Sequence, residues 1–195
     1  MFLRYSPAPH LRRTALGLAA AAILATGLPA LAADRWEVDP AASSLTFTGT
    51  QAGAPFTGSF QTWTANISFD PETLADSKVT VSIDVTSATT GDVQKDANLP
   101  TPNWFNSKAQ PMATFAARTF SKTADGFLAE GTLTVRDIDK PVQLPFTLEI
   151  DGDMASMKGE TTVKRTDFGV GTGVPLEMVG DGVTISVSVA AKRAQ

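Results

Sequence analysis

Apolar and polar residues alternate along most of the chain from residue 43 onward. The alternation is clearest in residues 63–69, 77–86, 127–136, 141–150 and 179–192. A period of two residues is typical of a strand that buries one face and exposes the other. The pattern therefore predicts an antiparallel all-β protein.

Turn dipeptides separate these segments, at Asp70-Pro71, Asp125-Gly126, Asp151-Gly152 and Asp181-Gly182. Together with the alternation they predict about eight strands, near residues 43–50, 56–69, 77–86, 112–120, 127–136, 141–150, 154–165 and 179–192. Many strands joined by short turns predict a sandwich or a barrel, and periodicity alone does not separate the two.

The second of these strands changes parity along its length. Phe56 and Phe60 stand at even positions, whereas Trp63 and Phe69 stand at odd ones. A bulge or sharp bend near Gln61–Thr62 would put all four on one face, and such a bend helps a sheet to curl.

Residues 87–111 interrupt the alternation for 25 positions that include three prolines. Loops of this length tend to be functional or to carry small helices. Within the segment, the sequence NWFNS (103–107) predicts one helical turn with Asn103 as its N-cap.

The first 32 residues have the features of a signal peptide. Arg4, Arg12 and Arg13 precede an apolar run at 15–28, and Ala30 and Ala32 form a small-residue cleavage pattern. The run of 14 residues is shorter than the roughly 20 that a membrane-spanning helix needs. We therefore predict cleavage after Ala32 and export to the periplasm, by the general or the twin-arginine route, with residues 33–195 as one mature domain.

Composition excludes many functions for residues 33–195. His10 and Tyr5 leave with the signal peptide, and the chain has no cysteine. A Ser-His-Asp triad, a Cys/His zinc site, an iron–sulfur cluster and His, Cys or Tyr ligation of haem are therefore excluded. Loss of three basic residues and no acidic one changes the formal charge from −4 to −7. Such a charge disfavours attraction to nucleic acid or anionic membranes.

Several sequence pieces, in this order and spacing, resemble the YceI-like family of secreted, lipocalin-like proteins that is associated with polyisoprenoids and other long-chain lipids. The pieces are WEVDPAASSLTFTG, FTGSF, ISFDPETLADSKVTVSIDVTS, NWFNSKAQPMATF, GTLTVRDIDKPVQLPF, RTDFGVGTG and VSVAAKRA. The resemblance covers essentially all of residues 33–195. It implies an eight-stranded antiparallel β-barrel with an elongated apolar cavity, here with a short helical, proline-rich insertion.

Twelve residues are candidates for contact with a lipid. Eight aromatic residues at one-face positions are expected to line the barrel or to fill it: Phe47, Phe56, Phe60, Trp63, Phe69, Phe115, Phe146 and Phe168. Trp104 and Phe105 are expected to form a lid over the cavity or a plug at one end. Met112 is an adaptable filler, like Met154, Met157 and Met178. Arg165 begins a glycine-rich segment that either forms a wide connection or places this arginine near a lipid head group.

The leading hypothesis is a periplasmic carrier of a polyisoprenoid, an isoprenoid quinone or a fatty amphiphile, without bond chemistry or a cofactor other than the lipid. The alternative is a filled barrel that docks a membrane cytochrome or another envelope partner. A third hypothesis, an enzyme that uses carboxylates alone, rests on the close pairs Asp137/Asp139 and Asp151/Asp153, for which solvated turns are the simpler interpretation. The sequence leaves open whether the protein is a monomer or a homodimer.

Overall fold

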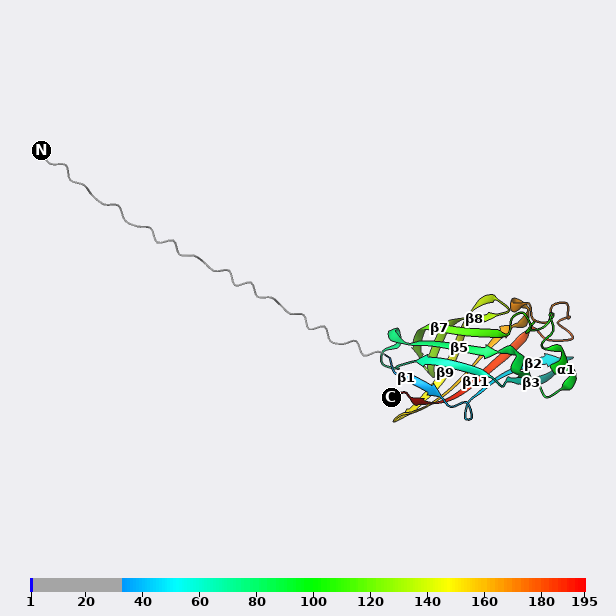
Figure 1. Cartoon of the computed structure of the whole chain (residues 1–195), viewed down its shortest axis with the longest axis horizontal. Coiled ribbons are helices and arrows are strands. Elements are labelled where there is room, and N and C mark those ends of the chain that lie inside the picture. Colours follow the sequence, from blue (N-terminus) through cyan, green and yellow to red (C-terminus); the bar gives the residue numbers. More distant parts are fainter. Residues whose placement is uncertain (2–32) are drawn as a thin grey trace. The chain divides into compact units, whose positions relative to one another are not determined.

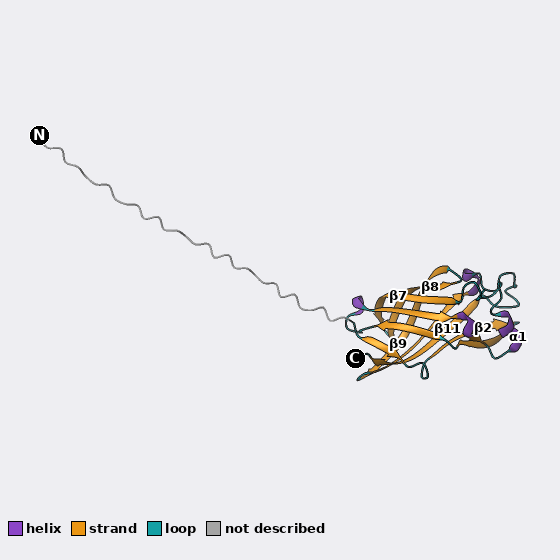
Figure 2. Ribbon diagram, in the orientation of Figure 1, coloured by secondary structure: helices purple, strands orange, loops and turns teal. Residues whose placement is uncertain are grey.

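The computed structural model describes Met1 and residues 33–195, so the predicted signal peptide lies outside the described residues except for Met1. The described residues form strands with a few short helices between them (Figures 1 and 2). In chain order these are β1 (Arg35–Val38), β2 (Ser44–Gln51), β3 (Ala54–Phe60), β4 (Trp63–Ser68), η1 (Leu74–Asp76), β5 (Lys78–Asp84), η2 (Val85–Ser87), β6 (Ala88–Thr89), α1 (Val93–Asn98), β7 (Met112–Thr123), β8 (Gly126–Val135), β9 (Ile138–Asp151), β10 (Met154–Lys164), η3 (Arg165–Phe168) and β11 (Gly182–Arg193).

The strands form one antiparallel sheet that closes on itself. The ring runs β1-β4-β5-β7-β8-β9-β10-β11, and β11 pairs again with β1. The other three strands continue positions of this ring, because β2 also pairs with β11, β3 with β2, and β6 with β3. The barrel therefore has eight strand positions, which confirms the predicted eight-stranded antiparallel barrel.

The chain bends where the parity of the second predicted strand changes. β3 ends at Phe60, a bend follows at Gln61, and β4 begins at Trp63. Phe60 and Trp63 are three residues apart, yet both face the barrel interior. The predicted bend is thus present, and it lets one stretch of chain pair with β2 before the bend and with β1 after it.

The segment at 87–111 carries a helix, but not at the predicted place. Residues 103–107 form turns, and the α-helix is α1, ten residues earlier. Its N-cap is Asp92, whose carboxylate accepts hydrogen bonds from the backbone N–H groups of Gln94 and Lys95. The prediction of a helical turn capped by Asn103 is therefore wrong, because Pro100 and Pro102 precede a chain reversal in which Trp104 N–H and Asn106 N–H both bond to Thr101 O.

Candidate functional site

The interior of the barrel holds a cavity of about 270 Å³. Inward residues of every barrel position line it, and almost every atom that faces it is carbon or sulfur. Thr161 and Arg165 are the lining residues that carry a hydroxyl or a charge. The barrel is thus hollow and apolar, and it has the width at which an eight-stranded barrel holds one slender ligand.

Eleven of the twelve candidate residues line this cavity. They are Phe47, Phe56, Phe60, Trp63, Phe69, Trp104, Phe105, Phe115, Phe146, Arg165 and Phe168. Met112 does not line it, because its side chain is 48% exposed on the outer face while the next residue, Ala113, faces inward. Met154 and Met178 are also exposed, whereas Met157 lies in the wall.

Several inward phenylalanines lie against glycines of the neighbouring strand. A Cβ on Gly58 would stand 2.3 Å from Cζ of Phe47, and one on Gly131 would stand 2.7 Å from Cε2 of Phe115. Because no side chain occupies these positions, each ring can rest against the backbone of the next strand. The rings therefore line the wall and leave the middle of the barrel open.

Four phenylalanines, here called the aromatic plug, close the barrel end at the β7–β8 turn: Phe69, Phe120, Phe127 and Phe146. Phe69 stands at the centre, with its ring centroid 5.3 Å from that of Phe120, 5.6 Å from Phe127 and 5.8 Å from Phe146. The three contacts are edge-to-face, the geometry that aromatic pairs prefer. Trp36, a lining residue that the sequence analysis missed, donates from its indole nitrogen to Phe69 O at 2.9 Å.

The opposite end is covered by residues 99–107, here called the lid. Leu99 is buried and accepts a hydrogen bond from Phe105 N–H at 2.9 Å. The Phe105 ring continues a row of aromatic side chains into the barrel, since its centroid lies 5.9 Å from Phe60, which lies 5.3 Å from Phe47. Trp104 and Phe105 thus lie at one end of the barrel, which fits both roles expected for them, a movable cover of the cavity or a fixed closure of that end.

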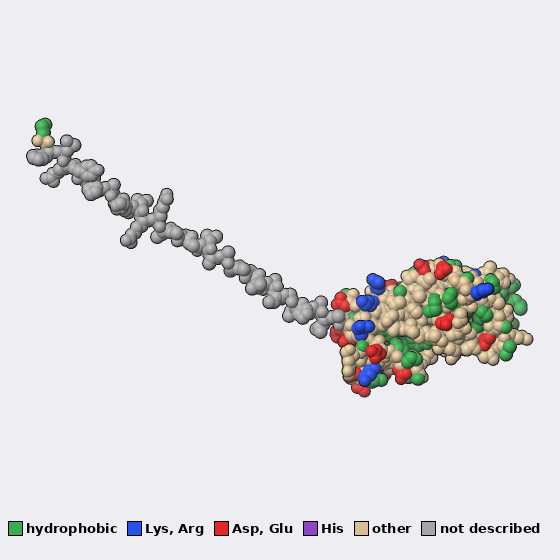
Figure 3. Space-filling model, viewed as in Figure 1, with side chains coloured by type: hydrophobic (Ala, Val, Ile, Leu, Met, Phe, Trp, Pro, Cys, Tyr) green, Lys and Arg blue, Asp and Glu red, His purple; other side chains and the backbone are tan. Residues whose placement is uncertain are grey.

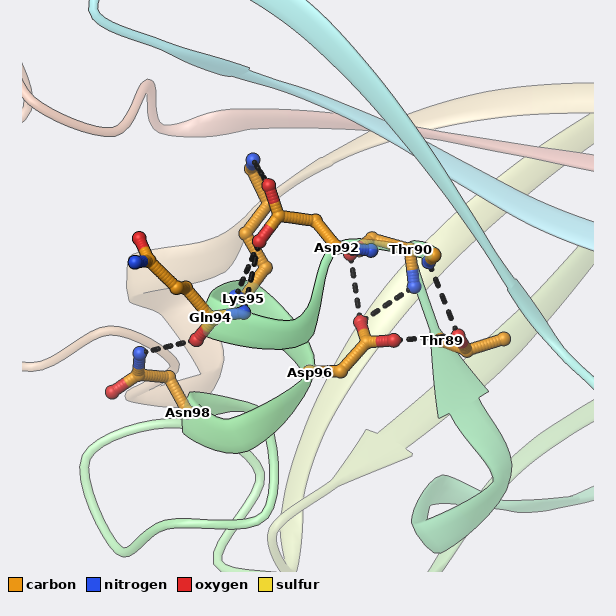
Figure 4. A network of polar contacts seen from close by, with 8 residues as sticks. Thr89, Thr90, Asp92, Gln94, Lys95, Asp96 and Asn98 are labelled. Atoms are coloured by element: carbon orange, nitrogen blue, oxygen red, sulfur yellow. Dashed lines mark hydrogen bonds and ion pairs between the residues drawn. The ribbon is translucent and has the colours of Figure 1, made fainter.

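The lid is anchored on one side by a polar network around Asp96 of α1 (Figure 4). Its carboxylate accepts hydrogen bonds from the Thr89 hydroxyl at 2.6 Å, and from the Thr90 hydroxyl and N–H at 2.7 Å each. These bonds, led by the one from the Thr89 hydroxyl, lower the pKa of Asp96 to about 2. The network fixes α1 to β6, and thereby fixes the start of the lid.

On the other side the lid contacts residues 165–181, here called the rim loop, which Arg165 organises from within. This side chain is 3% exposed, and its five N–H donors all reach backbone carbonyls at 2.9–3.0 Å. The acceptors are Val170, Gly171, Val174, Val179 and Gly180. Since a guanidinium has five N–H donors, Arg165 has none left for a lipid head group.

Arg136, at the β8–β9 turn, joins the lid to the rim loop. Its Nη1 donates to Trp104 O at 2.9 Å and to Gly169 O. The backbone adds two further links, because Gly171 N–H and Thr172 N–H both bond to Asn103 O, at 2.7 and 3.1 Å. Sequence reasoning missed Arg136, because nothing in a hairpin-turn arginine indicates a contact with two distant loops.

The acidic pairs lie in turns and make local contacts. Asp137 accepts from Gln110 Nε2 at 2.8 Å, and Asp139 accepts from the Thr134 hydroxyl at 2.7 Å. Asp151 and Asp153 flank Gly152, whose φ of 56° marks a tight turn. In the described part of the chain no three His, Cys, Asp or Glu side chains gather as metal ligands would. No helix among the described residues has the length and hydrophobicity to span a bilayer.

Comparisons with known proteins agree with this architecture. The model of the YceI-like domain family matches residues 36–191. A UPF0312 protein of Pectobacterium atrosepticum is 29% identical over 170 residues, which cover 83% of this chain and 88% of that protein. Protein YceI of Escherichia coli O157:H7 is 31% identical over 121 residues, which cover 59% and 63% of the two chains.

Two solved structures show the same fold. BcnA of Burkholderia cenocepacia superimposes with a TM-score of 0.77 at 29% identity, over 80% of this chain and 100% of that one. A polyisoprenoid binding domain from Saccharophagus degradans superimposes with a TM-score of 0.64 at 15% identity, over 83% and 99%.

Proposed function

The chain belongs to the YceI-like domain family, and on that premise we propose that it binds a long-chain apolar lipid in the barrel and carries it without bond chemistry. The observation that carries the proposal is the closed barrel with a hollow, carbon-lined interior of about 270 Å³. The alternative, a filled barrel that docks a membrane cytochrome or another envelope partner, requires an interior without such a cavity.

Burial of carbon is enough to hold such a ligand. Each methylene that leaves water contributes about 0.8 kcal/mol, so a chain of about 20 carbons contributes roughly 16 kcal/mol before the costs of association. A carrier of this kind therefore needs no ion pair and no catalytic group in its cavity. The wall described above, with aromatic rings along its length, meets this requirement.

A polyisoprenoid or an isoprenoid quinone is the ligand class that we favour, ahead of an unbranched fatty chain. The Saccharophagus degradans neighbour is named a polyisoprenoid binding domain, and its likeness to this chain is one of fold. The signal peptide predicted at residues 1–32 supports a periplasmic site of action, where a water-insoluble lipid between two membranes requires a carrier.

Native mass spectrometry of the protein purified from a periplasmic extract, followed by solvent extraction and lipid analysis, tests the proposal. We expect a discrete adduct that leaves with solvent and is identified as a long-chain lipid. A protein that arrives without adduct and takes up neither added ubiquinone nor geranylgeraniol would contradict the proposal.

A pair of variants on β4 connects the binding to the cavity. Ala65 lines the cavity, whereas the adjacent Thr64 is exposed on the outer face. Ala65→Phe fills part of the cavity and should reduce the bound lipid at least tenfold. Thr64→Phe adds the same ring outside and should leave the bound lipid unchanged, because neighbouring residues of a strand face opposite sides. Equal lipid content in both variants would place the ligand outside the barrel.

A further inference from the structure

The cavity contains a buried arginine, and yet this arginine has no free hydrogen-bond donor for an anion. We propose that the protein discriminates by head-group charge, and accepts a long chain that ends in a neutral group while rejecting the same chain with an ionised carboxylate or phosphate. This inference rests on the proposed function, since it names the class of lipid that the same cavity takes.

The chemistry of the cavity wall disfavours an ionised group. Of the side chains that line the cavity, only Arg165 is titratable, and almost no polar atom faces the open space. An ionised group that enters such a space loses its hydration shell and gains no hydrogen bond in return. The penalty for an unpaired buried charge exceeds what a few additional methylenes contribute.

Arg165 already has a hydrogen-bond partner for each of its donors. Two of its hydrogen bonds, to Gly171 O and Val179 O at 2.9 Å, are fully buried, and the other three donors are equally engaged. To bind an anion, the guanidinium would have to release carbonyls that shape the rim loop. Those carbonyls would then be left without donors at a further cost. Arg165 therefore acts as part of the backbone scaffold of the cavity mouth.

The surface around the lid carries ionised carboxylates. Asp92, Asp96 and Asp181 lie there, and hydrogen bonds lower the pKa of each, so all three are ionised at neutral pH. Of the basic groups, Lys95 is paired with Asp92 at 2.9 Å and Arg136 is bonded to Trp104 O.

Other basic side chains at this end, Lys108, Lys140 and Lys164, do not line the cavity. On the face seen in Figure 3, most Lys and Arg side chains gather at the end opposite α1. An anionic head group left at the mouth therefore meets carboxylates as well as these lysines, and no basic side chain with a free donor lines the cavity itself.

Retinol and retinoic acid form a matched pair of probes, because they share one isoprenoid-type carbon skeleton and differ in the terminal group. All three tryptophans of the mature chain, Trp36, Trp63 and Trp104, line the cavity, so quenching of their fluorescence reports entry. At pH 7.5 we expect retinol to bind at least tenfold more tightly than retinoate. Equal affinities, or tighter binding of retinoate, would overturn the inference while leaving the proposed carrier function intact. Binding of neither probe would count against both.

The pH dependence gives a second readout on the unmodified protein. A carboxylic acid with a pKa near that of Glu, about 4.3, is neutral in roughly one molecule in a thousand at pH 7.5. If only this neutral form enters, retinoate affinity should rise about tenfold per pH unit between pH 7.5 and 5.5, and retinol affinity should stay constant. The mature chain has no histidine to titrate in this window. A flat retinoate profile would overturn the inference.

A variant that supplies a free cation should reverse the preference. Thr161 faces the cavity from β10 and lies opposite Ile185 of β11. In Thr161→Lys we expect retinoate to bind at least as tightly as retinol, whereas Thr161→Val, which removes only the hydroxyl, should keep the original ratio. Circular dichroism verifies that both variants fold. A folded Thr161→Lys that still prefers retinol tenfold would show that charge matching does not set the selectivity.

Discussion

The two ends of the barrel are closed by different physical means. The aromatic plug consists of phenylalanine rings that strands and adjoining turns place in contact, with centroids 5.3–5.8 Å apart. The lid end consists of irregular chain held by hydrogen bonds, in which Arg165 and Arg136 donate to carbonyls of the rim loop and the lid. Apolar packing alone thus closes one end, whereas at the other end directional polar bonds hold the chain that places Leu99 and Phe105 over the cavity.

This difference indicates which end is able to move. Aromatic packing is spread over many contacts, and opening it exposes a large apolar area to water. The bond from Arg136 to Trp104 O, which joins the lid to the rim loop, is only partly buried. A hydrogen bond that water can reach is exchanged for bonds to water at a small net cost, about 1 kcal/mol. The lid end is therefore the end through which we expect a lipid to enter and leave.

Phe69→Ala breaks the apolar end and should have the largest effect on stability. The side chain is 5% exposed at the centre of the plug, and its removal leaves three rings facing a void. A loss of about 4 kcal/mol in the free energy of unfolding is expected. Urea unfolding measures it, with Phe69→Leu as the conservative control that retains most of the volume. A loss below about 1 kcal/mol would show that the plug does not stabilise the fold.

Arg165→Met removes the side chain whose hydrogen bonds hold the rim loop at the lid end. Methionine keeps the length of the side chain but has no donor, so the buried carbonyls of Gly171 and Val179 lose their partners. At about 1–3 kcal/mol for each orphaned buried group, we expect a loss of about 3 kcal/mol.

The same variant should loosen the lid selectively. In a background with Trp36→Phe and Trp63→Phe, acrylamide should quench Trp104 more strongly in Arg165→Met than in the parent. Arg165→Lys, which retains the charge and up to three donors, should fall between the two. If Phe69→Ala exposes Trp104 as much as Arg165→Met does, the two ends are not independent.

The strands could be predicted because each carries its own signal. A strand with one buried face shows it in the alternation of neighbouring residues, and turn dipeptides mark the boundaries. β1 and β6 were missed because four and two residues are too short for a pattern. Closure of the barrel depends on the pairing of Trp36 with Arg193, which are far apart in the sequence. Without the family resemblance, barrel and sandwich would have remained equal alternatives.

In the candidate site, too, some residue positions could be predicted from the sequence and others could not. Parity alone places Phe115 inside and Met112 outside, since the two are three positions apart in the regular first part of β7, before its register shift at Ala117–Thr119. The position of Met112 was therefore predictable. The environment of Arg165 was not predictable. Its acceptors are five backbone carbonyls of a loop. Every residue type has a backbone carbonyl, so the sequence does not identify these acceptors.

Asp96→Asn tests the polar end by pH and should have the smallest effect. The folded-state pKa of about 2 lies below the ordinary value of 3.8, so the ionised carboxylate stabilises the fold above about pH 4. This contribution is lost as the pH falls from 3.8 towards 2. Asparagine cannot accept all three hydrogen bonds, because its amide nitrogen is a donor. Thermal unfolding should therefore show the variant less stable than the parent at pH 6, with the difference closing by pH 2. A difference that persists at pH 2 would mean that the geometry of α1, and not the charge of Asp96, anchors the lid.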